Sequence, residues 1–341
     1  MKTFKKNKTK YRYLHKDAIL IKSIIYILVI LFCLSFLGCN KTNYNDNKKK
    51  LDSITTVPVT PTSTASQDTS TEKITMSKEA EIEEVVPKLE VVDYSDCFEK
   101  LSGCAVFFNR DTKVYDIYNE ELCEKRSSPY STFKIISTLI GLENGVINSV
   151  DSTMGYDGTI YSNEQWNKDL NLKDAFQESC VWYYRKVIDG IGQSEIQKWL
   201  DQLDYGNRDI SEWDGKGANS LRSLNGFWLG STLEISPKEQ VDILAKIFEG
   251  KTDFSKKSIN ILKEVMLTQK DETVTVYGKT GTGKDAGTGN IGNGWFVGML
   301  DNKDKKYYFA VRLTDENEKG INGLKAREVA LNVINKYYAK Q

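Results

Sequence analysis

Ser131-Thr132-Phe133-Lys134 opens the apolar run Ile135-Ile136-Ser137-Thr138-Leu139-Ile140, and this stretch predicts a helix that begins at a serine. Positions i and i+3 lie on one face of a helix, so the amine of Lys134 can reach the oxygen of Ser131. A serine hydroxyl becomes a good nucleophile only when a neighbouring base takes its proton. A lysine is such a base only when burial suppresses its charge, and the apolar residues beside Lys134 predict that burial. Free N–H groups in the first turn also favour an anion there.

The spacing alone is weak evidence, because Ser70-Thr71-Glu72-Lys73 repeats it in a polar tract. The histidine content is more informative. The one histidine of the chain is His15, which precedes an apolar N-terminal segment. A Ser-His-Asp triad, a Cys-His pair and a His-ligated metal site are therefore excluded, and we expect no metal. A nucleophilic enzyme with this sequence needs a lysine, a carboxylate or a tyrosine as its base.

The N-terminus has the order of an export signal. Basic residues crowd the stretch from Lys2 to Lys16, and a mostly apolar segment follows from Ile19 to Leu37. Its uninterrupted part is short for a membrane span, so residues 1–39 are interpreted as a signal peptide in preference to an uncleaved anchor. The end of the segment resembles a bacterial lipoprotein signal with Cys39 as the lipidated residue, although Phe36 replaces the usual leucine. Both alternatives place the domain outside, anchored to the outer face of the cytoplasmic membrane.

Composition sets further bounds on the chain. Forty-seven basic residues balance 47 acidic ones, so nucleic acid is not an expected partner. Residues 40–90 are rich in Ser, Thr, Asn and Lys, which predicts a flexible tether before a folded domain at 91–341. Export permits a disulfide among Cys97, Cys104 and Cys123, but these cysteines and Cys180 are equally compatible with buried thiols.

The periodicity of the folded part predicts an α+β fold. Strands are expected at 105–108, 113–118, 273–277, 295–300 and 307–313. Helices are expected at 131–140, 174–189, 194–203 and 240–248, and a last one carries an apolar stripe from Ala326 to Tyr337. Ser236 and Glu239 have the spacing of a capping box for the fourth helix. We expect one antiparallel sheet of five to six strands, flanked by helices, with an all-helical subdomain.

The glycine-rich run from Gly278 to Asp285 partly matches two nucleotide-binding motifs. Asp285 stands where a phosphate-binding P-loop needs Ser or Thr, and its carboxylate would repel phosphate. A dinucleotide loop must open a helix, whereas residues 287–292 are poor helix formers. Nucleotide binding is therefore disfavoured, and Lys279-Thr280-Gly281 is better read as the end of a strand.

Four short motifs occur in the order that is found in a known family of enzymes. They are Ser131-x-x-Lys134, Ser179-Cys180-Val181, Tyr205-Gly206-Asn207 and Lys279-Thr280-Gly281. Together they resemble the signature of the serine penicillin-recognising enzymes, and more narrowly that of the class D, oxacillinase-type β-lactamases. Phe227-Trp228-Leu229 before a strand also matches that class. The resemblance covers the chain from Cys104 onward and implies the β-lactamase/transpeptidase-like fold.

The resemblance also implies the chemistry. Ser131 would attack the β-lactam carbonyl and form an acyl-enzyme. Lys134 would carry carbon dioxide as a carbamate and act as the base, with no separately bound cofactor. Ser179, close to Lys279, would relay a proton to the leaving nitrogen.

Further residues would support the carbamate and hold the substrate. Trp228 would donate its indole N–H to the carbamate, and Val181 would pack against it. Backbone N–H groups of Ser131 and Thr282 would form the oxyanion hole. The remaining expected substrate-binding residues are Thr280, Gly281, Tyr205 and a cation on the last helix, which is Arg327 or alternatively Lys325. The Tyr205 motif is equally compatible with a simple turn.

Three functions remain compatible with these motifs. The first is a hydrolase that inactivates β-lactams, and the second is a β-lactam sensor that keeps the acyl group. The third is a cell-wall transpeptidase. The hydrolase is favoured over the sensor, because Val181 stands where we expect a sensor to have asparagine, and because the chain shows neither the several membrane helices nor the metalloprotease segment of such receptors. The Trp228 context and the tyrosine motif disfavour the transpeptidase.

Overall fold

The structure of the chain is a computed structural model that describes residues 86–215, 225–284, 291–303, 305–314 and 320–339. The predicted signal peptide, Cys39 and most of the predicted tether lie outside these described residues. Within the described ranges, none of the helices combines the length and the apolar character that a membrane crossing requires.

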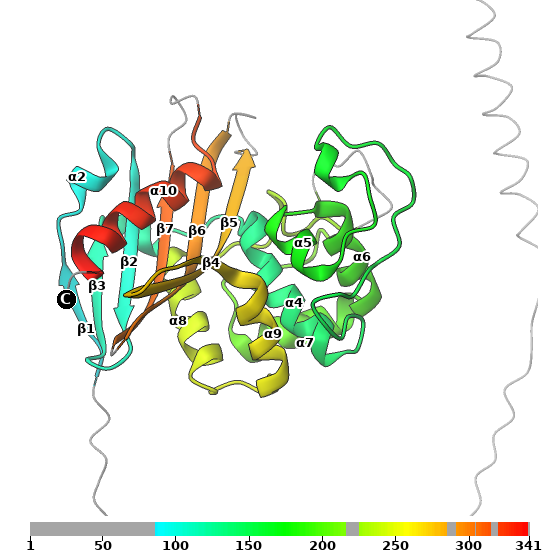
Figure 1. Cartoon of the computed structure of the whole chain (residues 1–341), viewed down its shortest axis with the longest axis horizontal. Helices are drawn as coiled ribbons and strands as arrows, with labels where there is room; N and C mark the ends of the chain where they lie inside the picture. Colours follow the sequence, from blue (N-terminus) through cyan, green and yellow to red (C-terminus); the bar gives the residue numbers. More distant parts are fainter. Residues whose placement is uncertain (1–85, 216–224, 285–290, 304, 315–319, 340–341) are drawn as a thin grey trace, which may run out of the picture. The chain divides into compact units, whose positions relative to one another are not determined.

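A seven-stranded sheet with the order β1-β3-β2-β7-β6-β5-β4 forms the centre of the domain (Figure 1). Its strands are β1 (Lys88–Val91), β2 (Gly103–Asn109), β3 (Val114–Tyr118), β4 (Leu267–Lys270), β5 (Val274–Lys284), β6 (Ile291–Asn302) and β7 (Lys305–Leu313). All neighbours are antiparallel except β1 and β3, which pair in parallel. The predicted α+β class is confirmed, and the predicted count of five to six strands was too low.

The two missed strands, β1 and β4, are short edge strands. Every residue of β1 is exposed, and β4 has no buried residue. Neither strand therefore has the alternation of apolar and polar residues by which a half-buried strand is recognised. Because β1 begins at Lys88, the folded part starts slightly before residue 91, inside the range predicted as a tether.

Helices cover both faces of the sheet. They are α2 (Ser95–Phe98), α3 (Glu120–Glu124), α4 (Lys134–Glu143), α5 (Leu172–Gln177), α6 (Val181–Ile191), α7 (Gln193–Leu203), α8 (Pro237–Phe248), α9 (Lys256–Met266) and α10 (Gly323–Val333). Short turns η1 (Tyr130–Phe133) and η2 (Glu164–Trp166) and a π-helical end η3 (Ile334–Tyr338) complete the described elements. In Figure 1, α10 lies across one face of the sheet, where it contacts β5, β6 and β7.

Side chains of β2 show how the two faces differ. Ala105 and Phe107 point into the apolar cluster beneath α10 and α2, whereas Val106 and Phe108 point into the larger cluster that holds α4 to α9. Both sets are buried, because a central strand with helices on both faces has no solvent-facing side. The sheet is therefore the middle layer of the domain.

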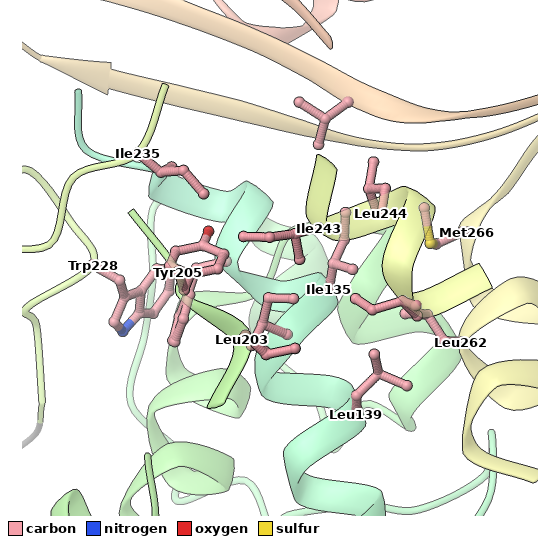
Figure 2. Close-up of a cluster of buried hydrophobic side chains, with 14 of the residues drawn as sticks. Ile135, Leu139, Leu203, Tyr205, Trp228, Ile235, Ile243, Leu244, Leu262 and Met266 are labelled. Atoms are coloured by element: carbon pink, nitrogen blue, oxygen red, sulfur yellow. The ribbon is translucent and has the colours of Figure 1, made fainter. Parts of the chain in front are cut away.

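The larger cluster fixes α4 at the centre of the helical layer. Figure 2 shows Ile135 and Leu139 of α4 among Leu203, Ile243 and Leu262, which come from three other helices. The predicted capping box of α8 is confirmed, because the Glu239 N–H donates to Ser236 Oγ and the Ser236 N–H donates to Glu239 Oε2. Burial on all sides makes α4 a rigid support for the residues at its start.

All four cysteines within the described residues are buried free thiols: Cys97, Cys104, Cys123 and Cys180. Of the two alternatives left open by the sequence, the structure has buried thiols.

Candidate active site

The nucleophile candidate lies at the junction of two helical segments. Ser131 belongs to the 3-10 turn η1, and Lys134 is the first residue of α4. Lys134 Nζ and Ser131 Oγ are 2.8 Å apart, which is a hydrogen-bond distance. Ser131 is partly exposed, whereas Lys134 is 0 % exposed. A ligand can therefore approach the serine while the lysine stays behind it.

The surroundings of Lys134 explain how its charge is suppressed. Its Nζ lies 4.5 Å from the ring centroid of Trp228 and 5.2 Å from that of Tyr184. Burial is the main reason why the pKa of Lys134 is well below its usual value, and the charge of Lys279 lowers it further. The predicted burial of Lys134 is thereby confirmed. Burial thus favours the neutral amine, which is the form that can accept the proton of Ser131.

A second serine–lysine pair joins the helical layer to the sheet. Lys279 on β5 is 3 % exposed, and its Nζ donates to Ser179 Oγ at 2.5 Å. Burial, and then the charge of Arg327, lower the pKa of Lys279 to about 7. The charge of Lys279 also lowers the pKa of Lys134, so the two pairs lie close enough to interact electrostatically. A group with a pKa near neutrality is well suited to hold or transfer a proton.

Ser179 reaches this site because the predicted helix at 174–189 is in fact broken. The structure has α5 up to Gln177 and α6 from Val181, with Ser179 between them at φ 55°. A non-glycine residue in this left-handed region is strained by about 1 kcal/mol. The single-helix prediction was wrong, because residues 178–180 contain neither Gly nor Pro to mark a break. The break turns the Ser179 hydroxyl toward Lys279.

The glycine-rich run is part of strand β5, which continues to Lys284. β4 pairs with β5 only as far as Tyr277, so this edge of β5 is not paired with β4 from Gly278 onward. A Cβ at Gly281 would lie 3.1 Å from Pro129 O and 3.1 Å from Thr132 Cγ2, so the strand runs directly against the Ser131 turn. A Cβ at Gly283 would fall inside the Tyr130 ring, at 1.8 Å. The glycines are thus needed for close approach of β5 to η1, and not for a phosphate loop.

A pocket of about 300 Å³ continues from Lys279 along this edge. Thr280 and Arg327 line it together with Phe176, Met266 and Phe296. Lys325 is different, because its Nζ forms an ion pair with Glu328 at 3.0 Å. Of the two cations proposed from the sequence, Arg327 therefore shares a pocket with Thr280 and Lys279. Thr282 lies two residues after Thr280 on β5, and its Oγ1 accepts a hydrogen bond from the Gly323 N–H at 2.8 Å.

Tyr205 does not lie on the open side of the site. It is 1 % exposed and packs edge to face against Phe133, with ring centroids 5.7 Å apart. Figure 2 shows it among the buried apolar side chains. The expected contact between Tyr205 and a substrate is therefore corrected: this residue supports the helix start from behind.

Trp228 lies beside Lys134, and Val181 packs against the same apolar cluster. Val181 is the first residue of α6 and is partly buried against the larger cluster. Trp228 faces Lys134 with its ring, but its indole N–H donates to Asn225 Oδ1 at 2.9 Å. The donor expected for a carbamate thus has another partner in this structure.

Sequence reasoning missed two residues of this environment, Tyr184 and Asn225. Tyr184 follows Val181 by three residues on α6, and this spacing could have indicated that both side chains lie on the same helix face. The Oη of Tyr184 lies 2.8 Å from Thr138 Oγ1. Asn225 precedes Trp228 by three residues, but nothing in its immediate sequence marks it as buried.

Comparisons with known proteins identify the family of the chain. Residues 103–335 match the family described as "Penicillin binding protein transpeptidase domain". The chain belongs to this family. Regulatory protein BlaR1 of Bacillus licheniformis is 36% identical over 250 residues, which cover 73% of this chain but only 39% of BlaR1. YbxI of Bacillus subtilis, named a probable beta-lactamase, is 31% identical over 246 residues, which cover 72% of this chain and 85% of YbxI.

Solved structures of both kinds of relative share the fold. The C-terminal domain of the B. licheniformis BlaR penicillin-receptor matches with a TM-score of 0.66 and 33% identity, covering 75% of this chain and 98% of that domain. A class D β-lactamase from B. subtilis matches with a TM-score of 0.64 and 30% identity, covering 73% and 97%. The resemblance to class D β-lactamases and the predicted fold are confirmed. The chain is also similar to penicillin-receptor domains.

Proposed function

We propose that this protein hydrolyses β-lactam antibiotics through an acyl-enzyme on Ser131. The observation that carries the proposal is the fully buried amine of Lys134, 2.8 Å from the Ser131 hydroxyl, in surroundings that lower the pKa of the amine. In a site without histidine, this arrangement places a base within hydrogen-bond distance of the hydroxyl that must lose its proton. The similarity to YbxI supports the choice of β-lactams as substrates.

Acylation begins when Lys134 takes the proton of Ser131 and the serine oxygen attacks the lactam carbonyl carbon. The developing oxyanion would accept hydrogen bonds from the backbone N–H groups of Ser131 and Thr282. The close approach of Gly281 to the Ser131 turn supports this pairing, because it brings β5 against η1. When the C–N bond breaks, Ser179 would protonate the leaving nitrogen, and Lys279, hydrogen-bonded to Ser179, would restore that proton.

Penicillins and cephalosporins carry a carboxylate beside the reacting ring. In this proposal Thr280 and Arg327 bind that carboxylate in the pocket that they line with Lys279, next to Gly281. Three cationic or hydroxyl donors from two elements give the pocket its anion preference. Substrate orientation then places the lactam carbonyl over Ser131.

Carbon dioxide, as a carbamate on Lys134, would supply an anionic oxygen base for deacylation. The amine fits this role, because only a neutral lysine takes up carbon dioxide, and burial keeps Lys134 neutral. The polar surroundings fit less well, since the Trp228 N–H is already donated to Asn225. We therefore assign no step to the carbamate.

A second candidate is a β-lactam sensor that is acylated without turnover, and the similarity to BlaR1 and to the BlaR penicillin-receptor domain favours it. Val181 at the start of α6 supports the hydrolase instead, because asparagine was expected there in a sensor. A cell-wall transpeptidase is the least supported of the three candidates.

Turnover distinguishes these candidates. The purified protein is mixed with excess penicillin, and product formation and the mass of the protein are followed together. Repeated turnover supports the hydrolase, and acceleration by added bicarbonate would indicate in addition that Lys134 takes up carbon dioxide. A single stoichiometric burst with a lasting adduct on Ser131 supports the sensor, and absence of any adduct on Ser131 rejects both.

The cellular location is also a proposal. Residues 1–39 would direct export, and a lipid on Cys39 would hold the domain at the outer face of the cytoplasmic membrane. Replacing Cys39 by serine should release the protein from the membrane fraction in cells that export it. Retention of the Cys39→Ser variant would instead indicate an uncleaved anchor.

A further inference from the structure

The indole N–H of Trp228 is held by a buried asparagine. Trp228 Nε1 donates to Asn225 Oδ1 at 2.9 Å, and both residues are 0 % exposed. The face of the same indole ring lies 4.5 Å from Lys134 Nζ. Trp228 therefore contacts the lysine through its ring while its one polar hydrogen serves Asn225.

Two acceptors on α6 fix the orientation of the Asn225 amide. Asn225 Nδ2 donates to Arg185 O at 2.9 Å and to Asp189 Oδ1 at 2.8 Å. A flipped amide would turn its oxygen toward these two oxygens and its NH2 group toward the indole N–H, so it is excluded. The amide oxygen is thus held in place to accept from Trp228, and both amide protons are used.

A carbamate on Lys134 would need a hydrogen-bond donor in the same sealed space. Its formation joins the amine nitrogen to the carbon of carbon dioxide and releases one amine proton to water, which leaves a buried anion. If this anion takes the Trp228 N–H, Asn225 Oδ1 loses its donor in a place without access to solvent. A buried acceptor without a partner is unfavourable by about as much as one hydrogen bond, which corresponds to roughly tenfold in an equilibrium constant.

We propose that Asn225 is a positioning residue that competes with a carbamate on Lys134 for the Trp228 indole N–H, and that it thereby weakens the uptake of carbon dioxide by this protein. The inference rests on the proposed function of Lys134 as the base. Asn225 lies outside the four motifs. In this proposal, the fraction of Lys134 that carries a carbamate depends on Asn225 as well as on the residues around the lysine.

The test measures carbamate directly. The full-length protein is titrated with 13C-bicarbonate, and the lysine carbamate is quantified by 13C NMR in the wild type and in Asn225→Leu. Leucine has the same branching at Cγ as asparagine but no acceptor, so the indole N–H is left to the carbamate. We expect the bicarbonate concentration at half-maximal carbamate to fall about tenfold in Asn225→Leu. An unchanged or higher concentration overturns the proposal.

A milder variant guards against misfolding of Asn225→Leu. Asp189 is exposed, so Asp189→Ala removes one of the two acceptors of the Asn225 amide and loosens it without opening a cavity in the core. We expect it to shift the bicarbonate titration in the same direction by a smaller factor, whereas Asp201→Ala, an exposed carboxylate on α7, should shift nothing. In a Trp228→Phe background, which has no N–H, Asn225→Leu should have no further effect. An equal effect in that background contradicts the competition.

One further measurement separates this inference from the function on which it rests. Penicillin acylation of Ser131 is followed by mass spectrometry in the same samples. If Ser131 is acylated but neither protein shows carbamate at saturating bicarbonate, the inference fails and the serine chemistry stands. If Ser131 is never acylated, the proposed function fails, and the NMR titration still decides what Asn225 does to Lys134.

Discussion

Lys279 Nζ lies 2.5 Å from Ser179 Oγ, and the two residues are 100 positions apart in the chain. The contact joins strand β5 to the break between α5 and α6, and it brings a second lysine into the site of Lys134. The two lysines differ in a useful way. The pKa of Lys134 is well below its usual value, while that of Lys279 is lowered to about 7. Burial thus favours the neutral form of Lys134, whereas Lys279 changes its charge near neutrality.

The pH dependence of acylation should report this difference. Lys279 is protonated below its pKa of about 7 and neutral above it, so kcat/KM for a penicillin should fall as pH rises through about 7. Arginine stays protonated throughout, so Lys279→Arg should abolish this alkaline limb even if its overall rate is lower. The measurement is a pH profile of kcat/KM for both proteins. A limb near pH 7 that persists in Lys279→Arg would assign it to another group.

Arg327 should bind the substrate carboxylate. Loss of a hydrogen bond to a charged group weakens binding by about ten- to a hundredfold, so Arg327→Ala should raise KM for penicillin by that factor. Because the charge of Arg327 lowers the pKa of Lys279, the same variant should move the alkaline limb to higher pH. Lys325→Ala is the matched control, since it removes a cation on the same helix that pairs with Glu328. Equal effects of the two substitutions would contradict the assignment of Arg327.

Local sequence patterns predicted the parts of this site that depend on local geometry. The i, i+3 spacing of Ser131 and Lys134 and the capping box of Ser236 and Glu239 both appear in the structure as expected. In each case the two residues lie within one helical turn, so the backbone alone brings them together. The burial of Lys134 was also predictable from its apolar neighbours.

Tertiary packing decided the rest. Ser179 has a left-handed backbone conformation, although no glycine in the sequence indicates one there. This residue forms the break between α5 and α6, two helices that pack in the same layer. Tyr205 belongs to a motif suggestive of substrate contact, yet it is buried behind Phe133. The partner of the Trp228 N–H depends on a side chain held by α6, a helix that ends more than 30 residues earlier in the chain. These three features depend on how helices and loops that are distant in the sequence pack together, which local sequence patterns do not specify.

Lys134 should be indispensable, whereas the other copy of its motif should not. Lys134→Met keeps the length and apolar fit of the side chain but removes the base, so acylation of Ser131 should slow by about 10²- to 10⁴-fold. Lys73→Met changes the lysine of Ser70-Thr71-Glu72-Lys73, which has the same spacing, and should leave the rate unchanged. Stopped-flow acylation with a chromogenic β-lactam measures both. A Lys134→Met variant that acylates at the wild-type rate would remove the lysine from the mechanism.

Ser179 permits its hydroxyl and its backbone to be tested separately. Ser179→Ala removes the hydroxyl and keeps a side chain at φ 55°, while Ser179→Gly removes the hydroxyl and also relieves the left-handed strain. Both variants should slow acylation by a similar factor, about 10²-fold, because both lose the proton relay to Lys279. Ser179→Gly should melt higher than Ser179→Ala, by roughly 2–4 °C, because glycine adopts this conformation without strain. Calorimetry and acylation kinetics on the same two proteins check these outcomes. If Ser179→Ala acylates like the wild type, the hydroxyl has no part in the reaction and the strained turn at Ser179 needs another explanation.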